Sequence, residues 1–503
     1  MQKTMGSRHL ALSCALLGTL YGPVPPAVAA PAAALIDASE LGLRDDLAWL
    51  ADRGLINLGL GTWPLPRARV TSALDARRLG LWSNADLDAL ARVRNALSRL
   101  DEPLLLSWRV NTARHPVSDA GLAERARNQA SIQVQPETDA AAAVRLRLGV
   151  QEQPLASTPS QATLDGSYAA MRLPGAVVAI GALDRWWGPA RYASPILGNA
   201  APAISALTLT RSDDAAPEST VLSWIGRWSY EISVGRPSHY QPSGPTTIGI
   251  RLSAQPLPGL ELGLSRYIYF GGEGQPHSFG ALRNALFANS NNDDPTDGED
   301  PSNEIAGIDL RWAVPVASAT WVGYAHFAGE DEANGSPSQW FGTVGLQLKH
   351  ATENHRVEWT VEGTDTSPDH WFGLRSDNRS PAYRHGVYVA GHYHQGLPVG
   401  AFIGGGGTLG SLGVAWTPID SPLALRYEAR LWRANVSRQG SEPINVAYGQ
   451  PGRVDGLSLQ GAGMTRTLRW HLGLAVQRAS GGTQPGRHDV GLIGGIEWVL
   501  REP

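Results

Sequence analysis

The chain has 503 residues, including 57 Gly, 35 Pro and 17 Trp, and its formal net charge is −4. Charged residues make up 17% and apolar residues 42% of the chain, a balance that excludes an intrinsically disordered protein. The slight negative charge argues against a nucleic-acid-binding surface, so we expect no nucleic-acid partner. Beyond the N-terminus the only lysine is Lys349, and the other cations are arginines, which can hold carboxylates bidentately.

The N-terminus has the pattern of a secretory signal peptide. Lys3 and Arg8 precede the apolar run LALSCALLGTLYG, and the tripeptide at 27–29 offers an A-x-A cleavage site. We expect a signal peptide over residues 1–29, cleaved after Ala29. Cys14, the only cysteine, would leave with it, so we expect no disulfide, thiolate metal site or cysteine nucleophile in the mature chain.

From about residue 34 to residue 100 the apolar residues recur with a helical period. The stretch LGLRDDLAWLADRGL places four apolar side chains on one stripe, and Gly54 can end this helix; the stripe consists of Leu43, Leu47, Leu50 and Ala51. Thr71 is the expected N-cap of a second helix, and Ser83 or Asn84 that of a third. These segments predict a small helical subdomain over residues 30–103.

From about residue 104 to residue 503 the period changes to two. In AVRLRLGVQ, Val144, Leu146, Leu148 and Val150 alternate with Arg145, Arg147, Gly149 and Gln151, and ALRYEARLW near the other end follows the same rule. We count about eighteen to twenty such runs of roughly nine to eleven residues, the length of a tilted transmembrane strand. No run of eighteen apolar residues follows the signal, so a membrane-embedded form must be a closed β-barrel.

A soluble sandwich or propeller is the alternative to a barrel. A sandwich of some 400 residues without a domain break would be unusual, and no repeat of about forty residues supports a propeller. In the barrel, the charged side chains that alternate with apolar ones along each strand face the lumen, and those on neighbouring strands are expected to pair with one another. Tryptophans near the ends of the runs are expected to form interfacial girdles; they are Trp312, Trp321, Trp416, Trp432, Trp470 and Trp498.

Several insertions are too long for hairpin turns. Residues 270–304 are expected to form an outer loop or lid, and 329–338, 365–384 and 439–453 shorter loops of the same kind. The first contains NSNNDDPTDGED, where Asp293 and Asp297 fit a calcium loop but Pro295 occupies a ligand position. A solvated acidic loop, a weak calcium site over 289–301 and contact with sugar hydroxyls remain open.

The sequence carries no catalytic motif that we recognise. Neither G-x-S-x-G nor H-E-x-x-H occurs, so we expect no enzyme and no catalytic residue. His392 and His394 in GHYHQG are spaced for a metal on one face of a strand, but no third ligand is evident. A lumen-facing polar pair is the simpler interpretation, and we expect no metal and no cofactor.

The stretch DRWWGPARYASPILGNA, residues 184–200, combines residue types that suit a carbohydrate. Adjacent tryptophans on a strand point to opposite faces, and the Gly-Pro pair after them ends the strand. Tryptophan rings stack on pyranose faces, while Arg, Asn and Asp bind hydroxyls and carboxylates. The alternative is that the Trp pair packs a loop against the barrel.

DRWWGP followed by LGNAAPAISALTLTR resembles the central motif of the capsule-assembly Wzi family of outer-membrane proteins. LRDDLAWLADRG, TWPL, LPGLELGLSR, IAGIDLRW, YAHFAGEDEANGSP and EGTDT match in the same order, from about Leu43 to Asp365. The resemblance implies an all-β transmembrane fold: an antiparallel outer-membrane barrel of about 18 strands over residues 104–503, with a small N-terminal α-helical subdomain. This subdomain would lie at the periplasmic end of the barrel, where it could plug the lumen.

By resemblance, the function is that of a lectin that binds exported capsular or extracellular polysaccharide and attaches it to the cell surface. The alternatives are a sugar-conducting channel and an outer-membrane hydrolase. The expected partners are an acidic polysaccharide and outer-membrane lipid, and the polysaccharide export machinery is a further candidate. The candidate ligand-binding residues are Arg185, Trp186, Trp187, Arg191, Asn199, Asp297 and Asp300.

Overall fold

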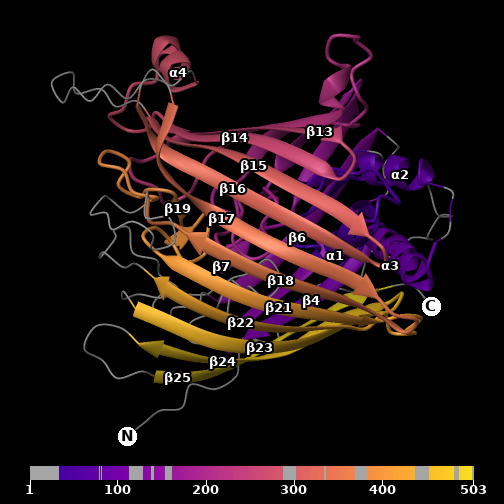
Figure 1. The fold of residues 1–503 in the computed structure, drawn as a ribbon. Coiled ribbons are helices and arrows are strands. Elements are labelled where there is room, and N and C mark those ends of the chain that lie inside the picture. Colours follow the sequence, from indigo (N-terminus) through magenta and orange to yellow (C-terminus); the bar gives the residue numbers. More distant parts are fainter. Residues whose placement is uncertain are drawn as a thin grey trace, which may run out of the picture.

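The computed structural model describes residues 33–78, 80, 82–112, 128–136, 141–152, 161–286, 302–333, 336–368, 382–436, 452–480 and 487–500. In these ranges the chain forms a closed antiparallel β-barrel (Figure 1). Strands β7 and β8 pair with different halves of β6 and share one position in the wall. The nineteen strand segments of the barrel therefore occupy eighteen positions, which confirms the predicted strand number.

The wall closes where β25, at the end of the chain, pairs with β4, which directly follows the helices. Its strands are β4 (Leu104–Asn111), β5 (Asn128–Val134), β6 (Ala142–Glu152), β7 (Gln161–Thr163), β8 (Tyr168–Leu173), β9 (Ala176–Gly181), β11 (Ala206–Arg211), β12 (Arg227–Gly235), β13 (Thr246–Leu257), β14 (Leu260–Phe270), β15 (Ser302–Val316), β16 (Ala319–Ala333), β17 (Ser336–Ala351), β18 (His355–Asp365), β21 (Thr408–Pro418), β22 (Arg426–Val436), β23 (Gly452–Met464), β24 (Leu468–Ser480) and β25 (Arg487–Val499).

The two-residue period sets the two faces of the wall. In β6, Leu146, Leu148 and Val150 are 44%, 50% and 56% exposed on the outside, whereas Arg145 is 6% exposed. The same alternation of exposed apolar and enclosed polar residues runs through the other long strands. An apolar outer face around a polar interior is the pattern of a barrel whose outside meets lipid.

The two ends of the barrel differ (Figure 1). One end, here called the helical end, carries the three N-terminal helices and most of the short connections, such as 258–259, 317–318 and 352–354. Its longest connection, 212–226, contains the 3₁₀ helix η1 (Ser223–Ile225). The opposite end, here called the loop end, carries α4 (Phe279–Leu286) and the long connections that contain residues 182–205 and 382–407.

The N-terminal helices are α1 (Leu41–Asp52), α2 (Arg67–Asp75) and α3 (Asn84–Leu100). Ser83 caps α3, with its side chain and that of Asp86 forming a reciprocal capping box. Gly54 follows α1 with a φ of 68°, as a helix-ending glycine should. The predicted second N-cap was wrong: α2 begins after Pro66, and Thr71 lies inside the helix. No helix in the described ranges is long and apolar enough to cross a membrane.

Three two-stranded sheets lie apart from the barrel wall. They pair β1 (Leu35–Ile36) with β3 (Leu65–Pro66), β2 (Thr62–Trp63) with β10 (Trp186–Trp187), and β19 (Tyr393–His394) with β20 (Leu397–Pro398). The β2–β10 sheet joins the N-terminal region to the tryptophan motif across more than a hundred residues of sequence.

Two sequence predictions about the wall need correction. Residues 329–338 were expected to be a loop, but β16 runs to Ala333 and β17 begins at Ser336, so the strands extend almost to the turn. Trp432 was expected in a girdle, but it is 5% exposed and covers Gly456, where an added Cβ would lie 2.1 Å from its ring. Trp312, Trp321, Trp416 and Trp498 are 41–56% exposed, as girdle residues should be.

Candidate functional site

Three segments of the chain meet inside the barrel, and we call them the lumen segments. They are residues 58–63 between α1 and α2, residues 182–205 between β9 and β11, and residues 382–407 between β18 and β21. Their apolar side chains are buried in two hydrophobic clusters. Inward-facing side chains of the barrel strands hold these segments in place.

Glu362 of β18 holds the backbone of residues 182–205, which we call the middle segment. Its carboxylate accepts hydrogen bonds from the N–H groups of Arg191 at 2.6 Å, Tyr192 at 3.0 Å and Ala193 at 2.9 Å. The Tyr324 hydroxyl donates to the same carboxylate at 2.7 Å. Hydrogen bonds to an ionised acceptor are the stronger kind, so one strand residue orients three consecutive peptide groups.

Two other strand glutamates do the same for the other segments. Glu261 of β14 accepts from the N–H groups of Leu60 at 2.9 Å and Gly61 at 3.0 Å. Glu330 of β16 accepts from the N–H of Tyr383 at 2.7 Å. The barrel wall therefore sets the path of all three lumen segments.

The tryptophan pair joins these segments together. Trp186 pairs with Trp63 and Trp187 with Thr62. The two rings point to opposite sides, as predicted: Trp186, 2% exposed, packs in the cluster of the N-terminal helices, and Trp187, 0% exposed, packs in the cluster of the loop end. Neither ring has a face open to a sugar in this structure, so the packing interpretation of the motif describes both rings.

Gly188 cannot carry a side chain at its position. Its φ is 94°, and an added Cβ would lie 2.2 Å from Nδ1 of His326. Its N–H donates to the carbonyl of Gly61 at 2.8 Å, next to the β2–β10 pairing. The glycine after the two tryptophans is therefore needed both for the turn and for the close approach to β16.

The other predicted site residues separate into two groups. Arg185 is 9% exposed and donates to the Thr208 hydroxyl at 2.6 Å, with Glu231 at 3.4 Å, so it ties the segment to β11 and β12. Arg191 and Asn199 line the main cavity of the lumen. Asp297 and Asp300 lie outside the described residues, as does the acidic stretch considered for calcium.

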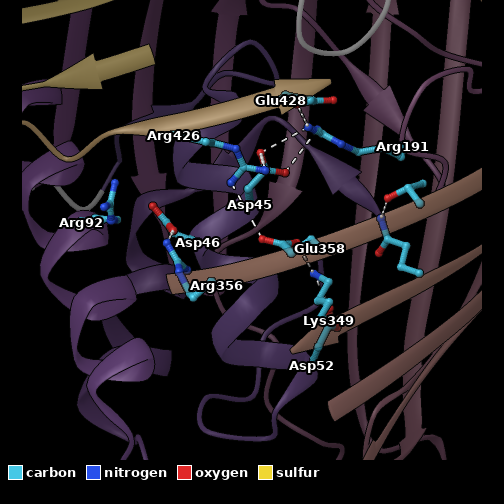
Figure 2. Close-up of polar contacts among 12 residues, drawn as sticks. Asp45, Asp46, Asp52, Arg92, Arg191, Lys349, Arg356, Glu358, Arg426 and Glu428 are labelled. Atoms are coloured by element: carbon cyan, nitrogen blue, oxygen red, sulfur yellow. Dashed lines mark hydrogen bonds and ion pairs between the residues drawn. The ribbon is translucent and has the colours of Figure 1, made fainter. Parts of the chain in front are cut away.

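Arg191 belongs to an ion-pair network between α1 and the barrel wall (Figure 2). It lies 3.2 Å from Asp45 of α1 and 3.1 Å from Glu428 of β22. Arg426, two residues before Glu428 on the same face of β22, holds Asp45 at 2.9 Å. Asp45 therefore connects the middle lumen segment and the wall to the first helix.

The same helix makes further ion pairs along its length (Figure 2). Asp46 lies 2.6 Å from Arg356 of β18. Asp52 lies 2.5 Å from Arg311 of β15 and 2.8 Å from Lys349 of β17. Charged strand residues were expected to pair across strands, and Glu358 does pair with Lys349 at 3.3 Å, but the nearest partners of Arg356 and Arg426 are helix carboxylates.

The surroundings of these charged groups on α1 shift their pKa values. Burial would raise the pKa of Asp52, but Arg311 and Lys349 outweigh it and hold this pKa below its ordinary value. For Asp46, burial dominates over Arg356 and raises the pKa. Burial and the nearby guanidinium of Arg191 lower the pKa of Arg44 to about 9. The network thus depends on a close balance of charge inside the lumen.

The histidine pair was placed wrongly by the sequence. His392 and His394 lie in the 382–407 segment, and neither lies on a barrel strand. The His392 ring pairs with the carbonyl of Ile196 at 2.6 Å, and the His394 ring with that of Pro202 at 2.9 Å. Burial lowers the pKa of His392 to about 4, so this ring clamps the middle segment in its neutral form.

A large cavity remains between the lumen segments and one side of the wall. It encloses about 1720 Å³ of empty space that continues into solvent. Its lining comes from α1, from β4–β6 and from β22–β24, and includes seven arginines and seven carboxylates. Within the described ranges, no group of three or more His, Cys, Asp or Glu side chains could hold a metal ion.

One row of polar residues crosses this side of the wall. Strand register places His471, Gly495, Arg109, Gln129 and Gln151 side by side on β24, β25, β4, β5 and β6. All of them except Gly495 line the cavity, where the His471 ring covers the position that a Gly495 side chain would take. None was singled out from the sequence, although the two-residue period had already assigned such polar residues to the lumen.

An apolar outer wall, a polar interior and closure without a free edge define an integral outer-membrane β-barrel. Three lumen segments cross its interior, and the N-terminal helices lie at one end (Figure 1). The model of the capsule assembly protein Wzi family matches residues 113–453. The chain belongs to this family, which confirms the family and outer-membrane predictions.

Two relatives place the chain within that family. Wzi of Escherichia coli, an outer-membrane protein involved in group 1 capsule assembly and described as a carbohydrate-binding β-barrel, superposes with a TM-score of 0.80 at 28% identity. This match covers 93% of our chain and 99% of that structure. An uncharacterized 55.8 kDa protein in the cps region of Klebsiella pneumoniae is 31% identical over 336 residues, which span 64% of each chain.

Proposed function

We propose that this protein binds an exported capsular or extracellular polysaccharide and attaches it to the cell surface without chemical turnover. The observation that supports this most is the large polar cavity inside a barrel of this family, lined by arginine, carboxylate and amide side chains. Such side chains bind sugar hydroxyls and carboxylates. The Escherichia coli relative is itself described as carbohydrate-binding.

We further propose different roles for the predicted site residues. Arg191 and Asn199 line the cavity and are the proposed ligand contacts. Arg185, Trp186 and Trp187 are buried and act by holding the 182–205 segment in place. Asp297 and Asp300, in the sequence between α4 and β15, remain proposed contacts.

The orientation and partners are part of the same proposal. Outer-membrane barrels have short turns on the periplasmic side and long loops outside, so the helical end faces the periplasm and residues 30–103 plug it. The bound polymer is acidic, the outer wall contacts membrane lipid, and the export machinery delivers the polymer. No cofactor and no catalytic group take part.

The test is the fate of the polymer in cells that lack the protein. Deletion is expected to release polysaccharide into the medium while total synthesis stays the same, and complementation should restore the cell-bound fraction. An unchanged cell-bound fraction would count against attachment. Planar-bilayer recordings address the channel alternative: the three lumen segments predict no steady open conductance, and regular open steps would favour a channel.

A further inference from the structure

The wall formed by β4, β5 and β6, here called the open wall, differs from the rest of the lumen in how its arginines are paired. Arg147 donates to the hydroxyls of Ser131 at 3.0 Å and Ser107 at 3.4 Å. Arg145 contacts Gln135 at 3.3 Å and the ring of Tyr168. In the described part of the chain, no ion pair involves Arg109, Arg145 or Arg147.

An arginine inside a barrel without a carboxylate partner is costly, because the surroundings are less polar than water. On β15, β18 and β22, by contrast, Arg311, Arg356 and Arg426 each contact a carboxylate within 3 Å. The open wall has no carboxylate in direct contact with its arginines in the described residues; Glu497 of β25 and Asp37 act on them from farther away. Two of the arginines, Arg109 and Arg147, face the empty space of the cavity. A ligand carboxylate would supply the direct partner that they lack, and a guanidinium binds such a group bidentately.

The remaining lining favours a sugar acid over a simple anion. Gln129 and Gln151 stand beside Arg109 in the polar row and offer both donors and acceptors to hydroxyl groups. Asp37 and Asp184 also line the cavity and can accept hydrogen bonds from hydroxyls, although they would repel a compact polyanion. The row from β4 to β6 spans two strand spacings, about 10 Å, which suits a short oligosaccharide segment.

We propose that Arg109, Arg147, Gln129 and Gln151 form a binding site for a carboxylated oligosaccharide segment inside the lumen. The site rests on the proposed function and specifies its ligand class and its place. The cavity also reaches Ala424 and Met464, beside the strand ends at the helical end, and is lined by α1. The acidic segment is therefore held beside the N-terminal helices, and Arg191 and Asn199 line the same space.

Isothermal titration of the full-length protein in detergent tests the site. The titrants are tetragalacturonate and its neutral, carboxyl-reduced counterpart. We expect the wild type to bind the acidic oligomer and the double variant Arg109→Gln/Arg147→Gln to bind it at least about tenfold more weakly, since each charged hydrogen bond contributes on the order of 1.5–3 kcal/mol. The neutral oligomer should bind more weakly and with equal affinity to both proteins.

Arg433→Gln is the matched control, because Arg433 is 64% exposed at its side chain and lines no part of the cavity. It removes one cation from the same barrel and should bind like the wild type. Circular dichroism and heat-shifted electrophoretic mobility establish that the double variant is folded. Equal affinity of the double variant and the wild type for tetragalacturonate, absence of binding by the wild type, or binding of both oligomers alike would overturn the site.

These outcomes are separate from the test of the proposed function. Polymer retention by cells that lack the protein overturns the attachment function itself. Charge-independent binding to the purified protein overturns only the site on the open wall.

Discussion

The lumen has two charged sides that use arginine differently. The side that faces α1, here called the paired wall, is built from β15, β17, β18 and β22, and its cations meet helix carboxylates at 2.5–2.9 Å. The open wall carries arginines of the same kind, but their described direct contacts are hydroxyl, amide and aromatic groups, and the carboxylates of Glu497 and Asp37 act on them from farther away. Arginine content alone therefore does not identify a binding surface; the position of the carboxylates does.

The largest effect is expected where the paired wall is broken. Asp52→Asn removes the buried carboxylate that Arg311 and Lys349 share, whose side chain is 1% exposed, and leaves Lys349 with Glu358 alone at 3.3 Å. Removing one partner of a buried ion pair costs about 3–5 kcal/mol. Equilibrium unfolding in urea with phospholipid vesicles measures the loss.

Asp455→Asn is the control for that change. Asp455 also holds two cations, Arg433 and Arg453, but its side chain is 35% exposed, so the loss should stay below about 1 kcal/mol. Similar losses for the two variants would remove the energetic basis of the comparison.

A somewhat smaller loss of unfolding free energy is expected when the middle segment is displaced. This segment carries Arg191, which pairs with Asp45 and Glu428. Gly188→Ala forces a Cβ against His326 at a φ of 94°, at a cost of roughly 3 kcal/mol from overpacking and backbone strain. The same unfolding assay applies. Gly323→Ala on the same strand as His326 places its Cβ in open space and is expected to be nearly neutral; a loss there equal to that of Gly188→Ala would contradict the steric argument.

The pH dependence of stability distinguishes Asp37 from Asp52. Burial, together with the neighbouring Asp184, raises the pKa of Asp37 to about 6, so between about pH 4 and pH 6 the folded state binds more protons than the unfolded state. Asp37 therefore lowers stability as the pH rises through this window, by up to about 3 kcal/mol. Asp52, whose pKa is lowered, acts in the opposite direction and loses its contribution as the pH falls.

Unfolding curves from pH 4 to pH 7 test this difference. Asp37→Asn should reduce the downward slope above pH 4, to which Asp101 with its raised pKa of about 6 also contributes, and raise the stability at pH 7 relative to the wild type. A slope that the substitution leaves unchanged would assign the dependence to other groups.

The smallest change in stability is expected on the open wall. Arg109→Gln/Arg147→Gln removes no described ion pair, so the unfolding free energy should change by less than about 1 kcal/mol, in either direction. The same urea assay measures it. A loss as large as that of Asp52→Asn would mean that these arginines support the fold, as those of the paired wall do.

Much of the wall was predictable from the sequence, because the two-residue period of a strand determines for each residue whether its side chain points inward or outward. The alternation from Val144 to Gln151 assigned Arg145 to the inside and Leu146 to the outside, as the exposures show. Trp432 broke the rule for girdles, since its strand position points inward and a glycine opposite makes room for the ring. The extension of β16 and β17 past 329–338 was missed because polar residues there resemble a loop.

The site was less predictable, because its contacts cross long distances in sequence. The sequence around Arg191 does not indicate that Arg191 forms ion pairs with Asp45 and Glu428. The Trp186–Trp187 motif was singled out from the sequence, but whether it faces sugar or protein depends on the partner strand at Thr62–Trp63. Arg109 and Gln129 were not named from the sequence, and only the closure of β25 onto β4 brings them beside His471.

The strand glutamates bind main-chain groups, so some side chains inside the barrel can differ without a change in the backbone. Glu362 binds the peptide N–H groups of residues 191–193, whatever side chains these positions carry, proline excepted. At residues 191–193 the backbone therefore keeps its course when a side chain that lines the cavity, such as that of Arg191, is exchanged. The strand glutamates thus determine the backbone conformation inside the barrel, and the inner surface can be adapted to a different polymer without a change in the barrel wall.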